Sequence, residues 1–264
     1  MNPQQRRQKV LQLLNEQHSL RVPELADALA VSAATLRRDL GQLAADQLIK
    51  RGHGKVERVE QPAQAMLKGS SFVQNAGHRS RQKRAIARRA AELCHEGDTV
   101  IINGGSTTFG MAQFLADRRM TILTNSFLLA QQLLVHSRND VLLPGGMVYR
   151  EQNVIASPFA SDVIRNHYAS KMFMGACGIS PLGVLETDPL LVQAELKLMA
   201  QAHTLVLLVD SSKFSASVAG LIVCPLRRIE LLITDKGIRP DTLRHLRSEG
   251  VEVMVVDADR EDLP

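Results

Sequence analysis

Hydrophobic residues in the first 58 positions recur at the spacing of three short helices followed by a hairpin. Residues 4–16, 22–30 and 32–43 each show helical periodicity, and Ser32 stands where the third helix would need an N-cap. The residues that set this periodicity are Val10, Leu11, Leu14, Leu25, Leu29, Leu36, Leu40 and Leu43. Residues 48–59 then form two short apolar runs around a glycine-containing turn, which predicts a hairpin.

The third predicted helix leaves polar and small residues facing outward, and the hairpin adds basic side chains. A helix start offers free N–H groups to phosphate oxygens, and arginine can reach phosphates or guanine edges in the major groove. We therefore expect residues 1–58 to be a winged helix-turn-helix domain that binds double-stranded DNA. A small helical bundle with solvated arginines is the alternative, which the capped helix and the basic wing disfavour. The candidate DNA contacts are Ser32, Ala33, Thr35, Arg37, Arg38, Arg51, His53 and Lys55.

Residues 59–77 are rich in Gln, Ala, Gly and Ser and contain few periodic apolar positions, so we predict a linker. Residues 78–93 follow as a basic helix. This helix could be a second nucleic-acid contact, or it could pack Ile86, Ala90 and Leu93 on a core with its arginines in water. We favour the second interpretation because charge runs on helices are usually solvated faces.

From residue 99 onward, apolar runs of strand length alternate with helical patterns. The predicted strands are 99–103, 121–124, 141–143, 171–177, 205–210, 231–234 and 251–256. After the first strand we predict a turn, GGSTT at 104–108, and a helix that ends at residue 115; further helices are predicted at 127–134, 190–202 and 240–249. Strands spaced by helices indicate a largely parallel sheet covered on both faces. We therefore expect residues 78–264 to form an α/β domain.

The predicted strands end in polar, glycine-containing segments. Glycines allow close approach of the backbone to a ligand, and hydroxyl and N–H groups can hold a phosphate. Each segment alone is typical of a turn, but four of them at strand ends favour an anion pocket, because ligands of such sheets bind there. The candidate residues are Asn103, Gly104, Gly105, Ser106, Thr107, Thr108, Thr124, Asn125, Ser126, Gly145, Gly146 and Lys213.

Composition narrows the class of protein. The chain has 264 residues, enough for two domains, and 45% hydrophobic residues but no apolar run long enough to span a membrane. Its N-terminus has no apolar segment of the kind a secretory signal requires. Cys94, Cys177 and Cys224 are widely spaced and odd in number, which is typical of reduced thiols and not of disulfides or a zinc site. We expect a cytoplasmic protein with no cofactor and no bound metal.

Positive charge is concentrated in the first part of the chain. Through Asp98 there are 17 Lys and Arg against 10 Asp and Glu, and beyond it 15 against 17. A basic head on a near-neutral body suggests a polyanion-binding module joined to a domain with another role. An excess of this size is also common on solvated surfaces.

Together these motifs resemble the DeoR family of bacterial repressors. In the N-terminal part the match rests on Ser32, Thr35, RRDL at 37–40 and R-x-H-G at 51–54. Lys55 and Val56 depart from the glycine and alanine that are usual in the family, and Lys55 adds a positive charge to the wing.

The second half resembles the DeoR effector domain, whose fold is related to ribose-5-phosphate isomerase. The matching segments are GST at 105–107, TNS at 124–126, the 145–146 glycine pair, AExKxM at 194–199 and DSSKF at 210–214. The resemblance adds Glu195 to the candidate effector contacts. It implies a repressor of a carbohydrate-utilisation operon, relieved by a phosphorylated sugar or sugar acid. Asn103, where most of the family has aspartate, and LETD at 185–188 are similar to the branch that regulates L-ascorbate utilisation.

We expect a homo-oligomer, a dimer or tetramer formed through the C-terminal domain, because palindromic operators require paired heads. The competing hypothesis is a sugar-phosphate isomerase-like enzyme with a DNA-binding head, in which Glu195 and Lys213 act as base and electrophile. An adaptor whose pocket binds nothing is a third hypothesis. Nucleotide hydrolysis is not expected, because GGSTT lacks the GxxxxGK spacing.

Overall fold

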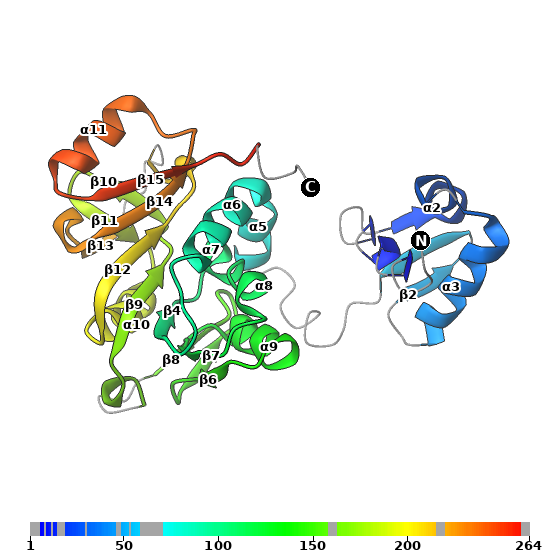
Figure 1. Cartoon of the computed structure of the whole chain (residues 1–264), viewed down its shortest axis with the longest axis horizontal. Helices are drawn as coiled ribbons and strands as arrows, with labels where there is room; N and C mark the ends of the chain where they lie inside the picture. The colour runs from blue at the N-terminus through cyan, green and yellow to red at the C-terminus, as the bar shows by residue number, and fades with distance from the viewer. Residues whose placement is uncertain are drawn as a thin grey trace. The chain divides into compact units, whose positions relative to one another are not determined.

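The computed structural model (Figure 1) describes the chain as two compact units, residues 1–68 and 69–264. The described residues are 6–7, 9–11, 13–14, 19–29, 31–45, 49–52, 54–58, 71–157, 163–214 and 220–259. Within these residues, no helix combines the length and the apolar character needed to cross a membrane.

The first unit is a winged helix-turn-helix, as the sequence predicts. The described residues between 6 and 14 are helical. The other elements are β1 (Ser19–Arg21), α2 (Val22–Leu29), α3 (Ala33–Ala45), β2 (Ile49–Gly52) and β3 (Lys55–Arg58). The predicted apolar positions Val10, Leu36 and Leu40 are fully buried in its core, which Ile49 and Val56 of the hairpin complete.

The wing has three strands, where the sequence analysis predicted two. The strands pair in the antiparallel order β1-β3-β2, with Leu20 opposite Val56 and Gly52 opposite Lys55. Gly54 takes a positive φ of 81° in the tight turn, a conformation that glycine adopts at little cost. Residues 19–21 are too few to show a strand periodicity, so β1 gave no signal in the sequence.

The second unit is built on a seven-stranded sheet in which every pairing is parallel. Its order is β15-β14-β12-β9-β4-β5-β6. The strands are β4 (Thr99–Ile102), β5 (Thr121–Leu123), β6 (Asp140–Leu142), β9 (Ala169–Met174), β12 (Ala202–Leu208), β14 (Leu231–Asp235) and β15 (Glu252–Val256). All seven predicted strands are therefore present, and the predicted parallel α/β fold is confirmed.

Helices cover both faces of this sheet, and successive residues of each strand enter different cores (Figure 1). In β9, for example, Met172 and Met174 pack toward α10 and α11, while Phe173 packs toward α6. The helices of the α6 side are α6 (Ser80–Ala91), α7 (Ser106–Phe109), α8 (Ala112–Leu115) and α9 (Phe127–His136), and those of the other side are α10 (Pro189–Met199) and α11 (Pro240–Ser248). The single helix predicted to end at residue 115 is thus two short helices, and the first of them begins within the predicted GGSTT turn.

Several short elements were not predicted. Strands β7 (Met147–Tyr149) and β8 (Val154–Ala156) form a hairpin, and β10 (Gly178–Ser180), β11 (Gly183–Glu186) and β13 (Leu221–Cys224) form an antiparallel sheet. The short 3-10 helices are η1 (Val163–Asn166), η2 (Ser211–Phe214) and η3 (Leu226–Arg228). Each element has only three or four residues, which is too short for a reliable hydrophobic period.

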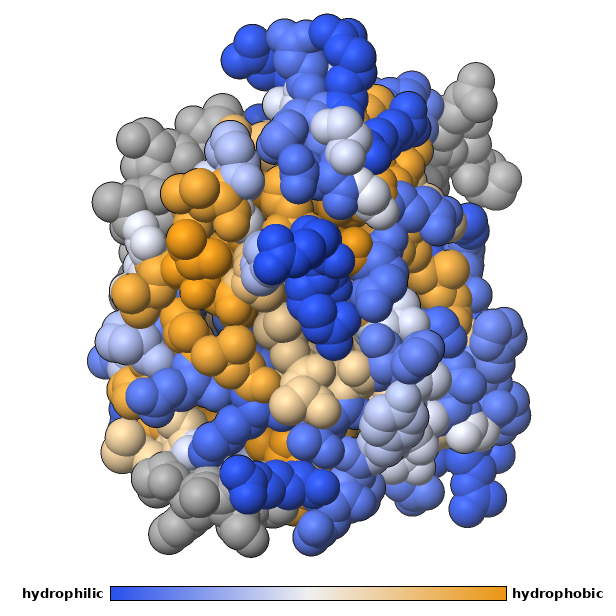
Figure 2. Space-filling view, turned by 90° about the vertical axis from the view of Figure 1, so that its left-hand side faces the viewer, coloured by the Kyte–Doolittle hydropathy of each residue, from blue (hydrophilic) through white to orange (hydrophobic). Residues whose placement is uncertain are grey.

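Apolar side chains gather on the face of the second unit that carries the β10-β11-β13 sheet (Figure 2). Helix α10 packs against β13 on this side of the unit. The exposed large apolar residues of these neighbouring elements and their connections are Leu182, Leu190, Leu196, Leu221 and Ile222. Contiguous exposed apolar surface often marks an interaction site.

Part of the predicted linker is helical. Residues Ser71–Gly77 form helix α5, in which Phe72 is only 7% exposed because its ring packs edge-on against Phe109. The basic helix that follows is amphipathic, with Ile86 and Ala90 fully buried. Among the basic side chains of this helix, Lys83 differs from the others because it is buried.

Candidate functional site

The start of α3 presents the predicted DNA contacts on an ordered helix turn. The Ser32 hydroxyl accepts a hydrogen bond from the N–H of Thr35 at 3.2 Å and bonds to the Thr35 hydroxyl at 2.9 Å, which confirms the predicted cap. Ala33, Arg37 and Arg38 are exposed. These residues are thus free of the core, as contact with DNA requires.

Asp39 lies within the RRDL motif but has a structural role. Its carboxylate is buried and accepts a hydrogen bond from Arg6 Nε at 2.5 Å, so it ties α3 to the first helix. This ion pair connects the part of α3 that carries Arg37 and Arg38 to the helical residues near the N-terminus.

The wing adds Lys55, which is exposed on β3, while its neighbour Val56 is fully buried. The valine that departs from the family pattern therefore contributes to the core, and the hairpin is retained. Arg51 lies in β2, but its side chain and the whole of His53 fall outside the described residues. That these residues contact DNA stays a prediction.

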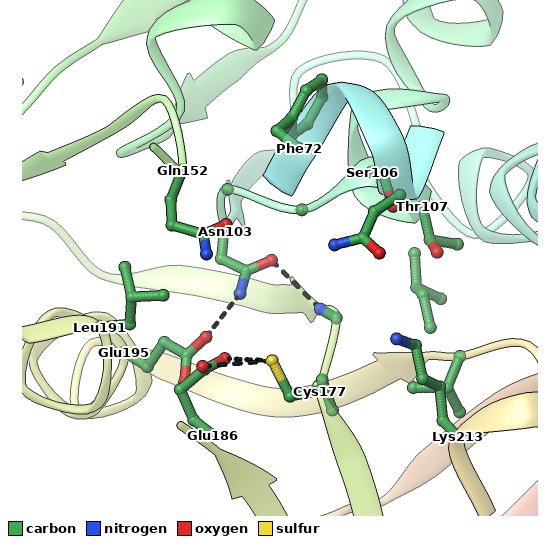
Figure 3. A pocket seen from close by; sticks show the side chains of 17 residues that line it. Phe72, Asn103, Ser106, Thr107, Gln152, Cys177, Glu186, Leu191, Glu195 and Lys213 are labelled. Carbon is green, nitrogen blue, oxygen red and sulfur yellow. Dashed lines mark hydrogen bonds between the residues drawn. The ribbon is translucent and has the colours of Figure 1, made fainter. Parts of the chain in front are cut away.

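A pocket in the second unit opens at the carboxyl ends of β4, β9 and β12, three adjacent central strands (Figure 3). The space between its lining residues is about 630 Å³, which includes open solvent. Its lining residues are Phe72, Asn75, Asn103, Gly104, Gly105, Ser106, Thr107, Gln152, Gly175, Ala176, Cys177, Glu186, Leu191, Glu195, Leu208, Val209 and Lys213. Its position at strand ends follows the general rule for open α/β sheets.

Seven of the predicted effector contacts line this pocket: Asn103, Gly104, Gly105, Ser106, Thr107, Glu195 and Lys213. Figure 3 shows Lys213 on the side of the pocket away from Glu186 and Glu195. Lys213 is half-buried, and no carboxylate of the described residues forms an ion pair with it. The pocket therefore has a cationic side and an acidic side.

Asn103 organises the acidic side. Its Nδ2 donates to Glu195 Oε1 at 3.1 Å, and its Oδ1 accepts the Gly175 N–H at 3.1 Å. An amide makes both contacts, whereas an ionised aspartate has no N–H to donate to Glu195. Burial raises the pKa of Glu195 to about 8, the nearby Glu186 adds to the rise, and the Asn103 hydrogen bond opposes it. At neutral pH the Glu195 carboxyl is therefore mostly protonated.

Glu186 is the second buried acid of the pocket, and several donors surround it. The Cys177 thiol donates to it at 3.2 Å, and the Thr187 N–H donates at 2.7 Å. Burial, followed by the adjacent Glu186, raises the pKa of Cys177 to about 12, so the thiol keeps its proton. The two acids thus differ in their donors: Glu186 accepts from the Cys177 thiol and a backbone N–H, whereas Glu195 accepts from the Asn103 side-chain amide.

The other predicted contacts do not line the pocket. Asn125 Oδ1 accepts the Gly104 N–H at 2.9 Å, Thr124 Oγ1 accepts the Ser126 N–H, and Ser126 caps α9 through Leu129 N–H. Thr108 donates to the Asn103 carbonyl. These polar side chains are used by neighbouring backbone groups, so they support the strand ends; Gly145 and Gly146 lie exposed at the β7 side.

Two family models match this chain. The model of the DeoR C terminal sensor domain covers residues 78–236, and that of the DeoR-like helix-turn-helix domain covers residues 6–62. The chain belongs to the DeoR family. It is therefore a DNA-binding transcriptional regulator, and the isomerase hypothesis is not supported.

The relatives agree with DeoR membership over nearly the whole chain. The HTH-type transcriptional regulator UlaR of Shigella dysenteriae serotype 1 (strain Sd197) is 31% identical over 97% of this chain and 100% of its own length. UlaR of Escherichia coli O127:H6 (strain E2348/69 / EPEC) has the same identity and coverage.

Among solved structures, ribose 5-phosphate isomerase A from Methanocaldococcus jannaschii matches with a TM-score of 0.36 and 17% identity, over 50% of this chain and 53% of its own. The full-length sorbitol operon regulator SorC from Klebsiella pneumoniae matches with a TM-score of 0.35 and 12% identity, over 96% of each chain.

Some pocket residues of this DeoR regulator escaped the sequence analysis. Phe72 and Asn75 lie in α5, before residue 78 where the sensor match begins, and they were assigned to the linker. Cys177 was interpreted only as a buried thiol. Glu186 belongs to the LETD motif, which was noted but not assigned to the pocket. Among the described residues, no group of three His, Cys, Asp or Glu side chains is arranged to hold a metal ion.

Proposed function

We propose that this regulator represses a carbohydrate-utilisation operon and that a phosphorylated sugar or sugar acid in the pocket lowers its affinity for the operator. The observation that supports this proposal is the polarity of the pocket. A sugar phosphate has an anionic end and a hydroxyl-rich end, and the pocket has a cationic side and an acidic side.

Lys213 lies on the side suited to the phosphate. Ser106 and Thr107 supply hydroxyl groups, and both belong to the first turn of α7, where N–H groups have no intrahelical partner. Lys213 is not neutralised by an ion pair within the described part of the chain, so its charge is available to an anion.

The acidic side suits sugar hydroxyls. Glu186 can accept hydrogen bonds from them, and the mostly protonated Glu195 can donate or accept. A ligand carboxylate would meet repulsion from Glu186 but a donor in protonated Glu195. The geometry thus favours a polyhydroxy compound with its phosphate toward Lys213.

The proposed switch is a population shift. Effector binding would favour an arrangement of the chain in which paired recognition helices no longer match the operator half-sites. Pairing requires a dimer or tetramer, which we assign to contacts of the second unit.

Thermal unfolding with a compound panel tests the pocket. The panel contains ribose 5-phosphate, fructose 6-phosphate and ascorbate 6-phosphate, each beside its unphosphorylated form. At least one phosphorylated compound is expected to raise Tm, because a ligand that binds only the folded state stabilises it.

Lys213→Ala should abolish that rise in Tm. Lys236→Ala should keep it, because Lys236 carries the same charge but does not line the pocket. If no phosphorylated compound raises Tm, or if Lys213→Ala responds as the wild type does, the proposed effector site is wrong.

A further inference from the structure

Helix α5 forms one wall of the pocket and directly follows the chain that leaves the DNA-binding unit. Only residues 59–70 separate β3 of the wing from Ser71. Phe72 and Asn75 of α5 line the pocket, and Phe72 lies beside it in Figure 3. Helix α5, which follows the wing and residues 59–70 in the sequence, is thus part of the ligand site.

One support of α5 is the helix that carries the pocket hydroxyls. The rings of Phe72 and Phe109 meet edge to face, with centroids 5.6 Å apart and planes at 88°. Phe109 ends α7, and Ser106 and Thr107 begin it. A ligand that binds these hydroxyls therefore also fixes the surface on which α5 rests.

The second support comes from the segment that carries Lys213. Arg79, at the corner between α5 and α6, donates from Nη1 to Ser211 Oγ at 2.9 Å, and its Nε lies 3.7 Å from Asp210 Oδ1. Arg79 has a φ of 53°, a left-handed conformation that is unfavourable outside glycine. Its contacts with residues 210 and 211 help to hold this corner.

Lys83 connects α5 to the charges of the cationic side. Its ammonium group is buried and donates to the backbone carbonyl of Asn75. Burial lowers the pKa of this ammonium group, the negative charge of Asp210 opposes that shift, and the positive charge of Lys213 adds to it. An anion bound next to Lys213 would offset this positive charge and strengthen the contact with α5. Lys83 itself does not line the pocket.

We propose that α5 transmits the occupied state of the pocket to the DNA-binding unit, and that Lys83 is the residue that couples α5 to the bound anion. This proposal rests on the proposed function of the pocket. A bound phosphate holds α7, the 210–213 segment and α5 in one arrangement. Without a bound phosphate, the charge of Lys213 weakens the contact between Lys83 and α5.

The first experiment separates ligand binding from its effect on DNA. The full-length wild type and Lys83→Met are compared on a duplex selected from a random pool, with the panel compound that gives the largest rise in Tm. In the wild type, this compound should raise the Kd for DNA by about tenfold or more, a typical allosteric coupling. Lys83→Met should keep the rise in Tm, but its Kd for DNA should change by less than about twofold. Lys236→Met, a surface lysine outside the pocket, is the matched control and should behave as the wild type does.

The second experiment follows α5 directly and does not depend on the folding of the Lys83 variant. The chain contains no tryptophan, so Gly77→Trp places one fluorescent reporter on α5, at an exposed position outside the pocket lining where a Cβ has no heavy atom within 4 Å. Its emission should shift when the compound binds, whereas Phe114→Trp on α8, away from the pocket lining, should not change.

The outcomes distinguish the two proposals. If the compound raises Tm but Lys83→Met releases DNA as the wild type does, or the Gly77→Trp emission stays constant, α5 is not the transmitting element and the pocket still stands. If no panel compound raises the Tm of the wild type, the proposed effector site fails, and the proposal for α5 fails with it.

Discussion

At the scale of single residues, the unusual group of the pocket is the buried Glu195. Its ordinary pKa of 4.5 is raised to about 8 in the folded chain, mainly by burial. Between these two values the folded chain binds more protons than the unfolded chain. The free energy of unfolding should therefore fall as pH rises across this interval and level off above it.

Glu195→Gln should remove this dependence, because glutamine is neutral at every pH and its Oε1 can still accept from Asn103. We expect the variant and the wild type to be similar in stability near pH 5, and the variant to be the more stable near pH 8. Urea unfolding of both proteins at several pH values measures the difference. If the free energies of unfolding of the two proteins change in parallel with pH, Glu195 is already ionised in the folded chain over the whole pH range tested.

Arg37 is the residue on which the DNA-binding prediction depends most directly. Arg37→Ala should weaken binding to the selected duplex. If Arg37 contacts a phosphate, the slope of log affinity against log salt concentration should fall by about 1. If it contacts a guanine, the preference for the correct base over a wrong one should fall by about 1–3 kcal/mol. Arg247→Ala removes an equal charge from an exposed site on α11 and should leave binding unchanged. Equal affinities for Arg37→Ala and the wild type would contradict the role of α3 in recognition.

At the scale of elements, the two predicted glycines before β7 differ in their surroundings. A Cβ on Gly146 would lie 2.3 Å from the Ala156 carbonyl oxygen, whereas a Cβ on Gly145 would have no heavy atom within 4 Å. Gly146 thus lets the β7 segment approach the end of β8.

Gly146→Ala should lower the free energy of unfolding by about 1–3 kcal/mol, a common cost of overpacking. Gly145→Ala should be close to neutral, and urea unfolding measures both. Similar stability for the two variants would mean that the hairpin adjusts without cost.

The hydrophobic pattern predicted the long elements. Helices show apolar residues at helical spacing, whereas runs such as TVII at 99–102 and LLIT at 231–234 are buried on both faces and were assigned to strands by their short length and their alternation with helices. The β10-β11-β13 sheet was missed because its strands are short and interrupted by turns. Phe72 was missed because one buried aromatic residue in a polar segment has no period, and its contact with Phe109 exists only in the tertiary fold.

The same distinction applies to the pocket. Glycines and hydroxyls at strand ends can be recognised in the sequence, and those after β4 do line the pocket. The chemically similar Thr124 and Ser126 do not, because nearby backbone N–H groups use their oxygens. Which polar groups are left for a ligand depends on these local partners.

At the scale of the whole molecule, the apolar patch of the second unit is where we expect two copies to meet. Leu182 and Ile222 are 71% and 50% exposed, which would be costly on a surface that always faced water. Ile222→Lys should shift the protein toward monomer in analytical ultracentrifugation and weaken its binding to a two-half-site duplex.

Leu134→Lys is the control for this prediction, because Leu134 is 65% exposed on α9, outside the patch. This variant should keep the oligomeric state of the wild type. If Ile222→Lys keeps it as well, the second unit pairs through another surface.

The position of α5 also determines where this regulator can be divided for protein engineering. The sensor match begins at residue 78, so a chimera designed from that boundary would join a foreign DNA-binding head directly before α6. Such a chimera would lack Phe72, Asn75 and the carbonyl that Lys83 contacts, and its pocket would be open on one side. Exchangeable sensors of this type should begin at or before Ser71, because α5 belongs to the second unit and supplies part of the binding site.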